Sequence, residues 1–446
     1  MPLMRLLCLT AALLAAWPAA AAPLQRAHFA NGANLVVLED HTAPVATVQV
    51  WLKVGGRDEL PGKSGLAHVF EHMMFKGSKA LGPGEFSNRI SAMGGNDNAF
   101  TSYDYTAYFE TVPADRVAEV LRMEAERFAN LRLDPREYAR EIRVIMEERR
   151  MRTDDNPNAR MFEELSAAAL KIHPYRNPVI GWMQDLKRLT IDDVRAFYRA
   201  HYVAANVTVV VVGDVDFSEV KRVVGATFGR MPRVAVPPRF NPVEPEPLGP
   251  KRIEVHLPGV QLPMVAVVMP VPVWHPGEND REAAALAVAT AILAEGRSAL
   301  LTRRLVDEQR LAYSASAGYD PFSMGIDLWA AWAMLGKGNT PDALLAGLWK
   351  SIEQLAHEGP DKAQLARAIR GIVADEVFAQ DSLYLRARRI GAMESVGLKA
   401  EARDRWLKLI RKVSAGDVRR VLRRWIRRGR ATTGVLLPRG KEESRS

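Results

Sequence analysis

The chain has almost no cysteine, and this absence limits its chemistry more than any other feature of its composition. Cys8 is the only cysteine among 446 residues, and it lies in an N-terminal segment that we expect to be removed. A chain without thiols cannot form disulfides, use a cysteine nucleophile or bind metal through thiolates. Any metal site must therefore be built from histidine and carboxylate side chains.

Long hydrophobic runs are also missing beyond the N-terminus. Residues 1–21 combine a basic start ending at Arg5 with an apolar run and a small-residue stretch ahead of Pro23. This pattern is typical of a secretory signal peptide cleaved near Ala21. The apolar run is shorter than the roughly 20 residues that a membrane span needs. We therefore expect a periplasmic or secreted protein without a transmembrane anchor.

Negative charge is in the minority, since the formal net charge is +9 and the pI is near 9.6. The basic stretch at residues 417–430 strengthens a nucleic-acid interpretation of this excess. Export argues against that interpretation, because an exported protein rarely meets nucleic acid. A solvated basic helix explains the same residues, so we expect no nucleic-acid partner.

Proline is concentrated in residues 231–251, which can sustain neither a helix nor a central strand. The segments on either side end alike, with an amphipathic helix followed by a strand, at an offset of 224 between Asp193 and Asp417. One fold is therefore used twice. We predict a signal peptide at 1–21, an N-terminal domain at 22–230, a linker at 231–251 and a homologous C-terminal domain at 252–440.

Apolar periodicity predicts the elements of the first half. The expected strands are residues 34–39, 45–53, one near 99–109, and 207–213. The expected helices are residues 65–75, 84–93, 117–130, 134–153 and 193–201.

The helix expected at 65–75 carries three polar groups, because GLAHVFEHMMFKGS places His68, Glu71 and His72 within five residues. On a helix the two histidines stand one turn apart on one face and can reach one ion. Neutral imidazole suits zinc, and an open coordination position lowers the pKa of a bound water to about 7. Glu71 is then placed to take the proton of that water.

The second half keeps this helix and loses its polar groups. AALAVATAILAEGRS aligns with the motif and carries Ala287, Thr290 and Ala291 at the three positions. The helix therefore does not need the histidines and the glutamate in order to pack.

A site with two histidines needs a third protein ligand, which the helix expected at 134–153 can supply. By helical geometry Glu141 and Glu148 lie near its apolar face, whereas Glu147 points away. Glu148 is therefore the predicted metal ligand, and Glu141 is a supporting carboxylate that accepts the N–H of a ligand. Glu147 is predicted to be a solvated surface charge.

The inverted H-x-x-E-H motif, followed by Glu148 76 residues after His72, resembles the inverzincin peptidases of the pitrilysin family. That family includes insulin-degrading enzyme and the mitochondrial processing peptidase. Similar blocks run along nearly the whole chain: GGNDNAFTSYDYTAYF, HPYRNPVIGW, FYRAHYVAANVTVVVVGD and RLAYSASAG. The resemblance implies Zn2+ as the cofactor, His68, His72 and Glu148 as its ligands, and Glu71 as the general base.

The resemblance also implies a fold and a partner arrangement. The fold class is α+β, with two homologous α/β-roll domains, each a mainly antiparallel sheet packed with helices, together forming half of a clamshell. In relatives an edge strand pairs with the extended substrate, which implies a substrate-binding role for Asn98, Ala99 and Phe100. Neither His173 nor His201 falls on a ligand position of the family, so we expect both to be structural.

One departure from the family pattern concerns the second half. Catalytic relatives often carry an Arg seven residues before the Tyr of an L-A-Y segment, and this pair helps to bind substrate. Here Tyr313 is present, but the position seven before it is Val306, with Arg303 and Arg304 out of register. The resemblance therefore implies the zinc subunit of a heterodimer whose partner supplies the Arg/Tyr pair. A homodimer is the alternative.

Together these features predict an exported zinc metallo-endopeptidase that hydrolyses peptides or unfolded protein segments. The alternative is a non-catalytic or scaffold subunit of a peptidase complex, against which the complete ligand set argues. The sequence leaves open the cleavage preference and whether the ion is zinc, manganese or cobalt.

Overall fold

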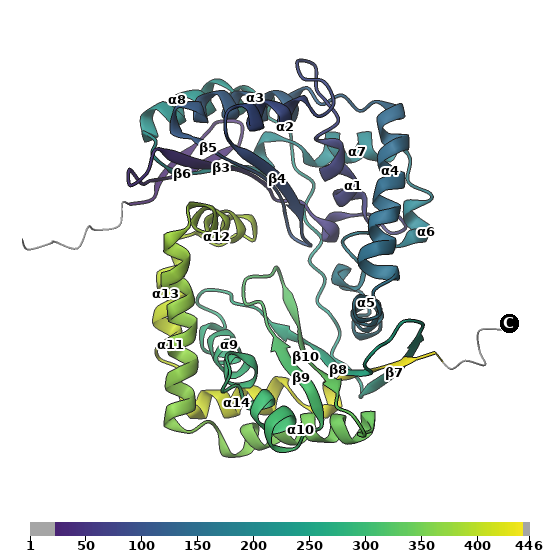
Figure 1. The fold of residues 1–446 in the computed structure, drawn as a ribbon. Coiled ribbons are helices and arrows are strands. Elements are labelled where there is room, and N and C mark those ends of the chain that lie inside the picture. The colour runs from purple at the N-terminus through teal and green to yellow at the C-terminus, as the bar shows by residue number, and fades with distance from the viewer. Residues whose placement is uncertain (1–22, 440–446) are drawn as a thin grey trace, which may run out of the picture.

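A computed structural model of the chain describes residues 23–439 (Figure 1). The predicted signal peptide, including Cys8, lies outside the described residues. None of the helices within 23–439 is both long enough and apolar enough to span a membrane.

The strands of the described part are β1 (Gln25–His28), β2 (Asn34–Glu39), β3 (Val45–Leu52), β4 (Asn96–Thr101), β5 (Thr106–Pro113), β6 (Val207–Gly213), β7 (Lys251–Leu257), β8 (Met264–Pro272), β9 (Ala312–Gly318), β10 (Ile326–Leu335) and β11 (Thr432–Pro438). The helices are α1 (Leu66–Met73), α2 (Glu85–Ala92), α3 (Val117–Ala129), α4 (Pro135–Arg149), α5 (Pro157–Ala169), α6 (Met183–Leu186), α7 (Ile191–His201), α8 (Phe217–Ala226), α9 (Asp280–Ala294), α10 (Pro341–Glu358), α11 (Lys362–Phe378), α12 (Leu383–Ser395), α13 (Ala402–Ile410) and α14 (Ala415–Trp425). Two π-helical segments are Arg150–Asp154 and Thr302–Glu308.

The strands form two sheets, one in each half of the chain (Figure 1). The first has the order β1-β2-β6-β3-β5-β4 and the second the order β7-β11-β8-β10-β9. Paired strands are antiparallel except β2 with β6 and β7 with β11. The predicted α+β class, with two mainly antiparallel halves packed with helices, is confirmed. Residues 231–250 form neither helix nor strand, and β7 begins at Lys251.

The two halves end in the same local structure, a capped helix followed by a strand. A capping box starts α7 at Thr190 and Asp193, and another starts α14 at Ser414 and Asp417. In each box the N-cap hydroxyl accepts from the third backbone N–H, and the aspartate accepts from the N-cap N–H. The strand that follows each helix then joins its sheet parallel to one neighbour. The repeat seen in the sequence therefore extends to the topology.

The predicted elements of the first half are confirmed except near residues 99–109, where the prediction of one strand is wrong. Two strands stand there, because β4 and β5 pair antiparallel on either side of a turn. The Ser102 hydroxyl accepts from the backbone N–H of Asp104 and of Tyr105, each at 3.2 Å. This turn is closed by a side chain and contains neither glycine nor proline, the strongest sequence signals of a break, although Ser102 and Asp104 are residue types common in turns.

One helix of each half packs against the sheet of the other half. Helix α12 of the second half lies against the first sheet, whose inner face buries Trp51 (Figure 1). Helix α5 of the first half lies against the second sheet through Met161 and Leu165. Glycines allow both approaches, because a Cβ would lie 2.1 Å from Trp51 at Gly391 and 2.0 Å from Met161 at Gly434. The exchange places residues of α12 beside the first sheet.

Candidate metal centre

The motif residues lie on α1, whose first turn depends on a close backbone approach. Gly65 precedes the helix with φ 88°, and a Cβ there would lie 2.7 Å from the carbonyl oxygen of Ile180. Only glycine meets both conditions without strain. The carboxylate of Glu59 accepts from the backbone N–H of Gly65 (2.9 Å) and of Ala67 (2.7 Å), and so satisfies the helix N-terminus. Our sequence reasoning missed this cap, because Glu59 lies outside the helix.

The structure brings together the side chains of the three predicted ligands. The Nε2 atoms of His68 and His72 lie 3.7 Å and 3.4 Å from Oε2 of Glu148. One ligand atom from each residue lies within 4.8 Å of the other two. His68 Nδ1 and Glu148 Oε2 are buried without a hydrogen-bond partner among residues 23–439. A buried carboxylate oxygen facing two imidazole nitrogens fits a zinc ion, which takes nitrogen and oxygen ligands.

Helix α4 presents its two adjacent glutamates to different surroundings. The side chain of Glu148 is 13% exposed and that of Glu147 is 69% exposed. Glu147 pairs with Arg150, while Oε1 of Glu148 lies 3.0 Å from Arg152. The exposures of the two side chains follow the predicted helix faces, although Glu147 also lines an open hollow together with Glu148.

Glu141 lies behind His72, on the side away from Glu148. Its Oε1 is 2.8 Å from Nδ1 of His72 and its Oε2 is 2.6 Å from Nζ of Lys76. With a proton on Nδ1 held by this carboxylate, a neutral His72 would present the lone pair of Nε2 on the side of Glu148, where an ion would bind. The arrangement suits a ligand whose tautomer and ring orientation must be fixed.

The pKa values of the two histidines in the cluster are shifted in opposite directions. Burial and, to a smaller extent, the neighbouring His72 lower the pKa of His68 to about 4. Burial also acts to lower the pKa of His72, but the hydrogen bond to Glu141 and the nearby carboxylate of Glu148 outweigh it and raise the pKa to about 9. The imidazole of His72 in turn lowers the pKa of Glu148, against the effect of burial.

Glu71 lines an open hollow beside the metal-ligand candidates, of about 740 Å3. Burial raises its pKa, and the hydroxyl of Thr101, which donates to its Oε2, partly offsets that rise. A carboxylate with a raised pKa is suited to accept a proton near neutral pH. The residues lining the hollow are His68, Glu71, His72, Asn98, Ala99, Phe100, Thr101, Val144, Glu147, Glu148, Met151 and Arg152.

The predicted substrate residues Asn98, Ala99 and Phe100 lie on β4, the edge strand of the first sheet, and line this hollow. Thr101 on the same strand is a contact of Glu71 that our sequence reasoning missed. Strand periodicity was the available signal, because residues two apart on a strand share a face.

Tyr313 is not brought to the metal centre. It lies on β9, the edge strand of the second sheet, is 54% exposed, and is absent from the lining of the hollow. Val306 is half-buried in the segment Thr302–Glu308 and packs against the core of the second half.

Two other histidines, His173 and His201, are not among the residues that line this hollow. His173 is fully buried, and Nδ1 accepts from the backbone N–H of Tyr175 at 3.3 Å. Burial lowers the pKa of His173 to about 4 and also lowers the pKa of His201.

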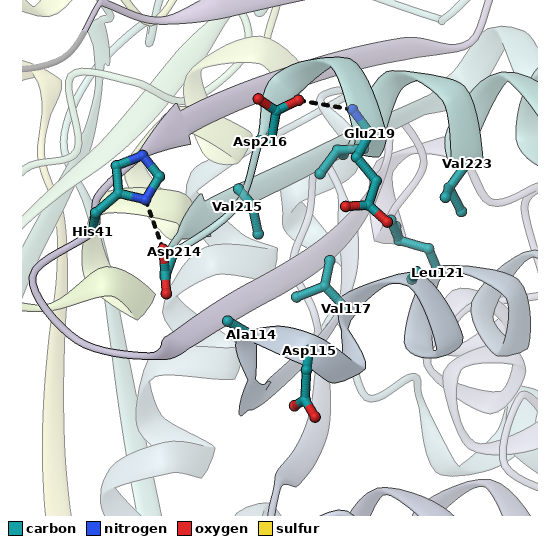
Figure 2. Close-up of a pocket in the computed structure, with 12 residues that line it drawn as sticks. His41, Ala114, Asp115, Val117, Leu121, Asp214, Val215, Asp216, Glu219 and Val223 are labelled. Carbon is teal, nitrogen blue, oxygen red and sulfur yellow. Dashed lines mark hydrogen bonds and ion pairs between the residues drawn. The ribbon is translucent and has the colours of Figure 1, made fainter.

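A separate hollow of about 370 Å3 lies between the end of β6, α8 and the start of α3 (Figure 2). Its acidic groups already have local partners, since Asp214 lies 2.6 Å from His41 and Asp216 accepts from the backbone N–H of Glu219 as the N-cap of α8. None of the metal-ligand candidates lines it.

Comparison with known proteins gives two family matches. "Insulinase (Peptidase family M16)" matches residues 35–182, and "Peptidase M16 inactive domain" matches residues 188–372. The chain belongs to peptidase family M16. The predicted membership in the pitrilysin-like family is therefore confirmed.

Two of the proteins similar to this M16 chain are named zinc proteases. The zinc protease PqqE of Helicobacter pylori is 36% identical over 290 residues, which are 64% of this chain and 64% of that protein. An uncharacterized zinc protease of Streptomyces coelicolor is 26% identical over 427 residues, covering 95% and 91% of the two chains. The beta subunit of the mitochondrial-processing peptidase of Blastocladiella emersonii is 30% identical over 203 residues, covering 46% and 43%.

Solved structures share the fold over most of the M16 chain. A protease from Helicobacter pylori superimposes with a TM-score of 0.88 at 28% identity, over 94% of this chain and 100% of that one. The periplasmic protease PqqL of Escherichia coli gives a TM-score of 0.77 at 17% identity, which shows the fold alone. The match covers 94% of the M16 chain and 48% of PqqL.

Proposed function

We propose that this M16 chain is an exported zinc metallo-endopeptidase that hydrolyses peptides or unfolded protein segments. The observation that carries the proposal is the convergence of His68, His72 and Glu148 around one point, with Glu71 lining the same hollow. The relatives named zinc proteases support it.

In the proposed mechanism His68, His72 and Glu148 hold the ion. A bound zinc ion supplies Lewis acidity, which lowers the pKa of a water molecule to about 7 and polarises a carbonyl group. Glu71 accepts a proton from the attacking water and delivers it to the amine nitrogen as the peptide C–N bond breaks. The Thr101 hydroxyl holds the carboxylate of Glu71 through this cycle.

The edge strand β4 provides the substrate-binding surface in this proposal. As an edge strand it has one side without a neighbouring strand. An extended peptide would pair on that side and replace the bond from the Ala99 N–H to Asn98 Oδ1, which makes Asn98, Ala99 and Phe100 substrate-binding residues. Main-chain pairing of this kind requires an extended segment, so short peptides and unfolded chains are the expected substrates.

The variant Glu71→Gln tests the mechanism. It removes the proposed base and none of the proposed ligands, so peptide hydrolysis should fall by about 10²–10⁴-fold. Zinc content, measured by elemental analysis, should stay unchanged. Full activity in a Glu71→Gln protein that still binds zinc would sink the proposal.

We also propose that the working peptidase has two chains, of which this is the zinc subunit. Val306 leaves no guanidinium seven residues before Tyr313, and Tyr313 lies outside the hollow of its own chain. A homologous chain could supply an Arg/Tyr pair. Light scattering and peptide cleavage by the purified chain test this proposal: robust turnover by a homodimer would contradict it, and activity that appears only on mixing supports it.

Export is the remaining part of the proposal. Residues 1–21 have the pattern of a signal peptide, and one protein of the same fold is named a periplasmic protease. Recovery of the protein from the periplasm with an N-terminus near Pro23 is expected. Cytosolic protein that begins at Met1 would contradict it.

A further inference from the structure

A positively charged side chain of the second half contacts the candidate substrate strand of the first. Helix α12 lies against the inner face of the first sheet (Figure 1). The guanidinium of Arg388 on this helix lies 5.1 Å from the ring centroid of Phe100. Phe100 belongs to the edge strand β4 and lines the hollow of the metal centre. The two halves therefore meet beside the proposed substrate strand.

Arg388 differs from the arginines next to it on α12. Arg386 pairs with Asp40, and Arg389 lies 3.2 Å from Glu376. Arg388 is exposed and has no carboxylate partner among residues 23–439. Stacking on an aromatic ring orients a guanidinium while its N–H donors stay free at the edge. The guanidinium of Arg388 is therefore oriented by the Phe100 ring, and its N–H groups can donate to another molecule.

The alternation of β4 decides which part of a substrate meets this cation. Thr101 donates to Glu71, so Ala99 and Thr101 share the α1 side of the strand. Phe100 points to the other side, where its ring packs edge-on against Trp51 at 5.5 Å. A peptide paired with β4 alternates in the same way, so every second side chain lies on the side of Phe100 and Arg388.

We propose that Arg388, held over Phe100, is a specificity determinant that selects an acidic side chain in the substrate segment paired with β4. A carboxylate can accept two N–H bonds from one guanidinium. This inference rests on the proposed peptidase function and adds a substrate class to it. The contact lies on the strand side opposite Glu71, so it selects substrate without taking part in bond cleavage.

Paired peptides test the inference on the full mature chain loaded with zinc, alone and with any activating partner. Each pair differs by Glu or Gln at one position, and that position is moved along the residues flanking the scissile bond. The wild type should cleave the Glu peptide with about fivefold higher kcat/KM at positions two residues apart. The preference should shrink as sodium chloride is raised, because salt screens an exposed ion pair.

Variants of α12 identify the residue responsible. Arg388→Gln should remove the Glu preference and leave the rate on the Gln peptide unchanged, and Arg388→Glu should favour a Lys peptide instead. Arg389→Gln is the matched control on the next residue, and it should keep the preference. Arg403 still pairs with Glu376 in that control.

A binding measurement separates failure of the inference from failure of the proposed function. Fluorescence anisotropy of the same peptides on zinc-loaded Glu71→Gln protein should show tighter binding of the Glu member, and this difference should disappear in the double variant with Arg388→Gln. Equal cleavage and equal binding of Glu and Gln peptides would overturn the role of Arg388 while the peptidase function stands. Absence of both cleavage and binding for every peptide would overturn both.

Discussion

The two adjacent glutamates near the end of α4 offer a direct test of the metal centre. Glu148→Gln removes the charge of a carboxylate whose Oε2 lies 3.4 Å and 3.7 Å from Nε2 of His72 and His68. Glu147→Gln makes the same chemical change one residue earlier, on a side chain that is 69% exposed. The two variants therefore make the same chemical change on two different faces of α4.

The expected difference in zinc affinity is large. Loss of a group that merely supports a ligand costs about 10–100-fold in metal affinity, so loss of a ligand should cost at least about 100-fold, or roughly 2.7 kcal/mol. Glu147→Gln removes only a surface pair with Arg150 and should change zinc affinity less than about twofold. The metal-free stability should change by no more than about 1 kcal/mol in Glu147→Gln, because Glu147 pairs only with the exposed Arg150.

Competition with a chromophoric chelator at one pH measures the zinc affinity, and urea unfolding of the metal-free proteins checks that both variants fold. Equal affinity losses in the two variants, or a larger loss in Glu147→Gln, would refute the assignment of Glu148 as a ligand. Such a result would also show that the burial of a glutamate on α4 does not predict whether it binds zinc.

Two further predictions concern the contacts between the halves and the response to acid. Gly391→Ala, which places a Cβ 2.1 Å from the Trp51 ring, should lower the free energy of unfolding by about 1–3 kcal/mol. Gly371→Ala on α11, where the nearest atom is a flexible carboxylate oxygen at 3.7 Å, should raise it by about 0.5–1 kcal/mol, and equal effects in urea unfolding would contradict the packing argument. Burial holds the pKa of His173 near 4 in the folded protein, below its unfolded value of about 6.5. The unfolded chain therefore gains a proton first as the pH falls from 6.5 to 4, so stability is lost across that window. His173→Asn should remove about 3 kcal/mol of this loss, and an unchanged pH slope would count against it.

The sequence alone was sufficient for features that depend on nearby residues. The spacing of His68 and His72 places both on one face of α1. The same periodicity places Glu141 and Glu148 on one face of α4. The capping boxes of α7 and α14 repeat at Thr190 and Ser414 for the same reason, since a cap involves only the first turn. The turn at Ser102 shows the limit of such signals, because a hydroxyl closes it without glycine or proline.

Only the tertiary structure decided the contacts between distant segments. The order of strands makes β4 an edge strand, and this order follows from pairing between segments far apart in the chain. The exchange of α5 and α12 between the halves brings Arg388 onto Phe100, across 288 positions of sequence. Local periodicity reports which face of an element is apolar, but it does not report which other element covers that face. The sequence therefore determined the motif and its helices, whereas packing of the two halves determined what surrounds the substrate strand.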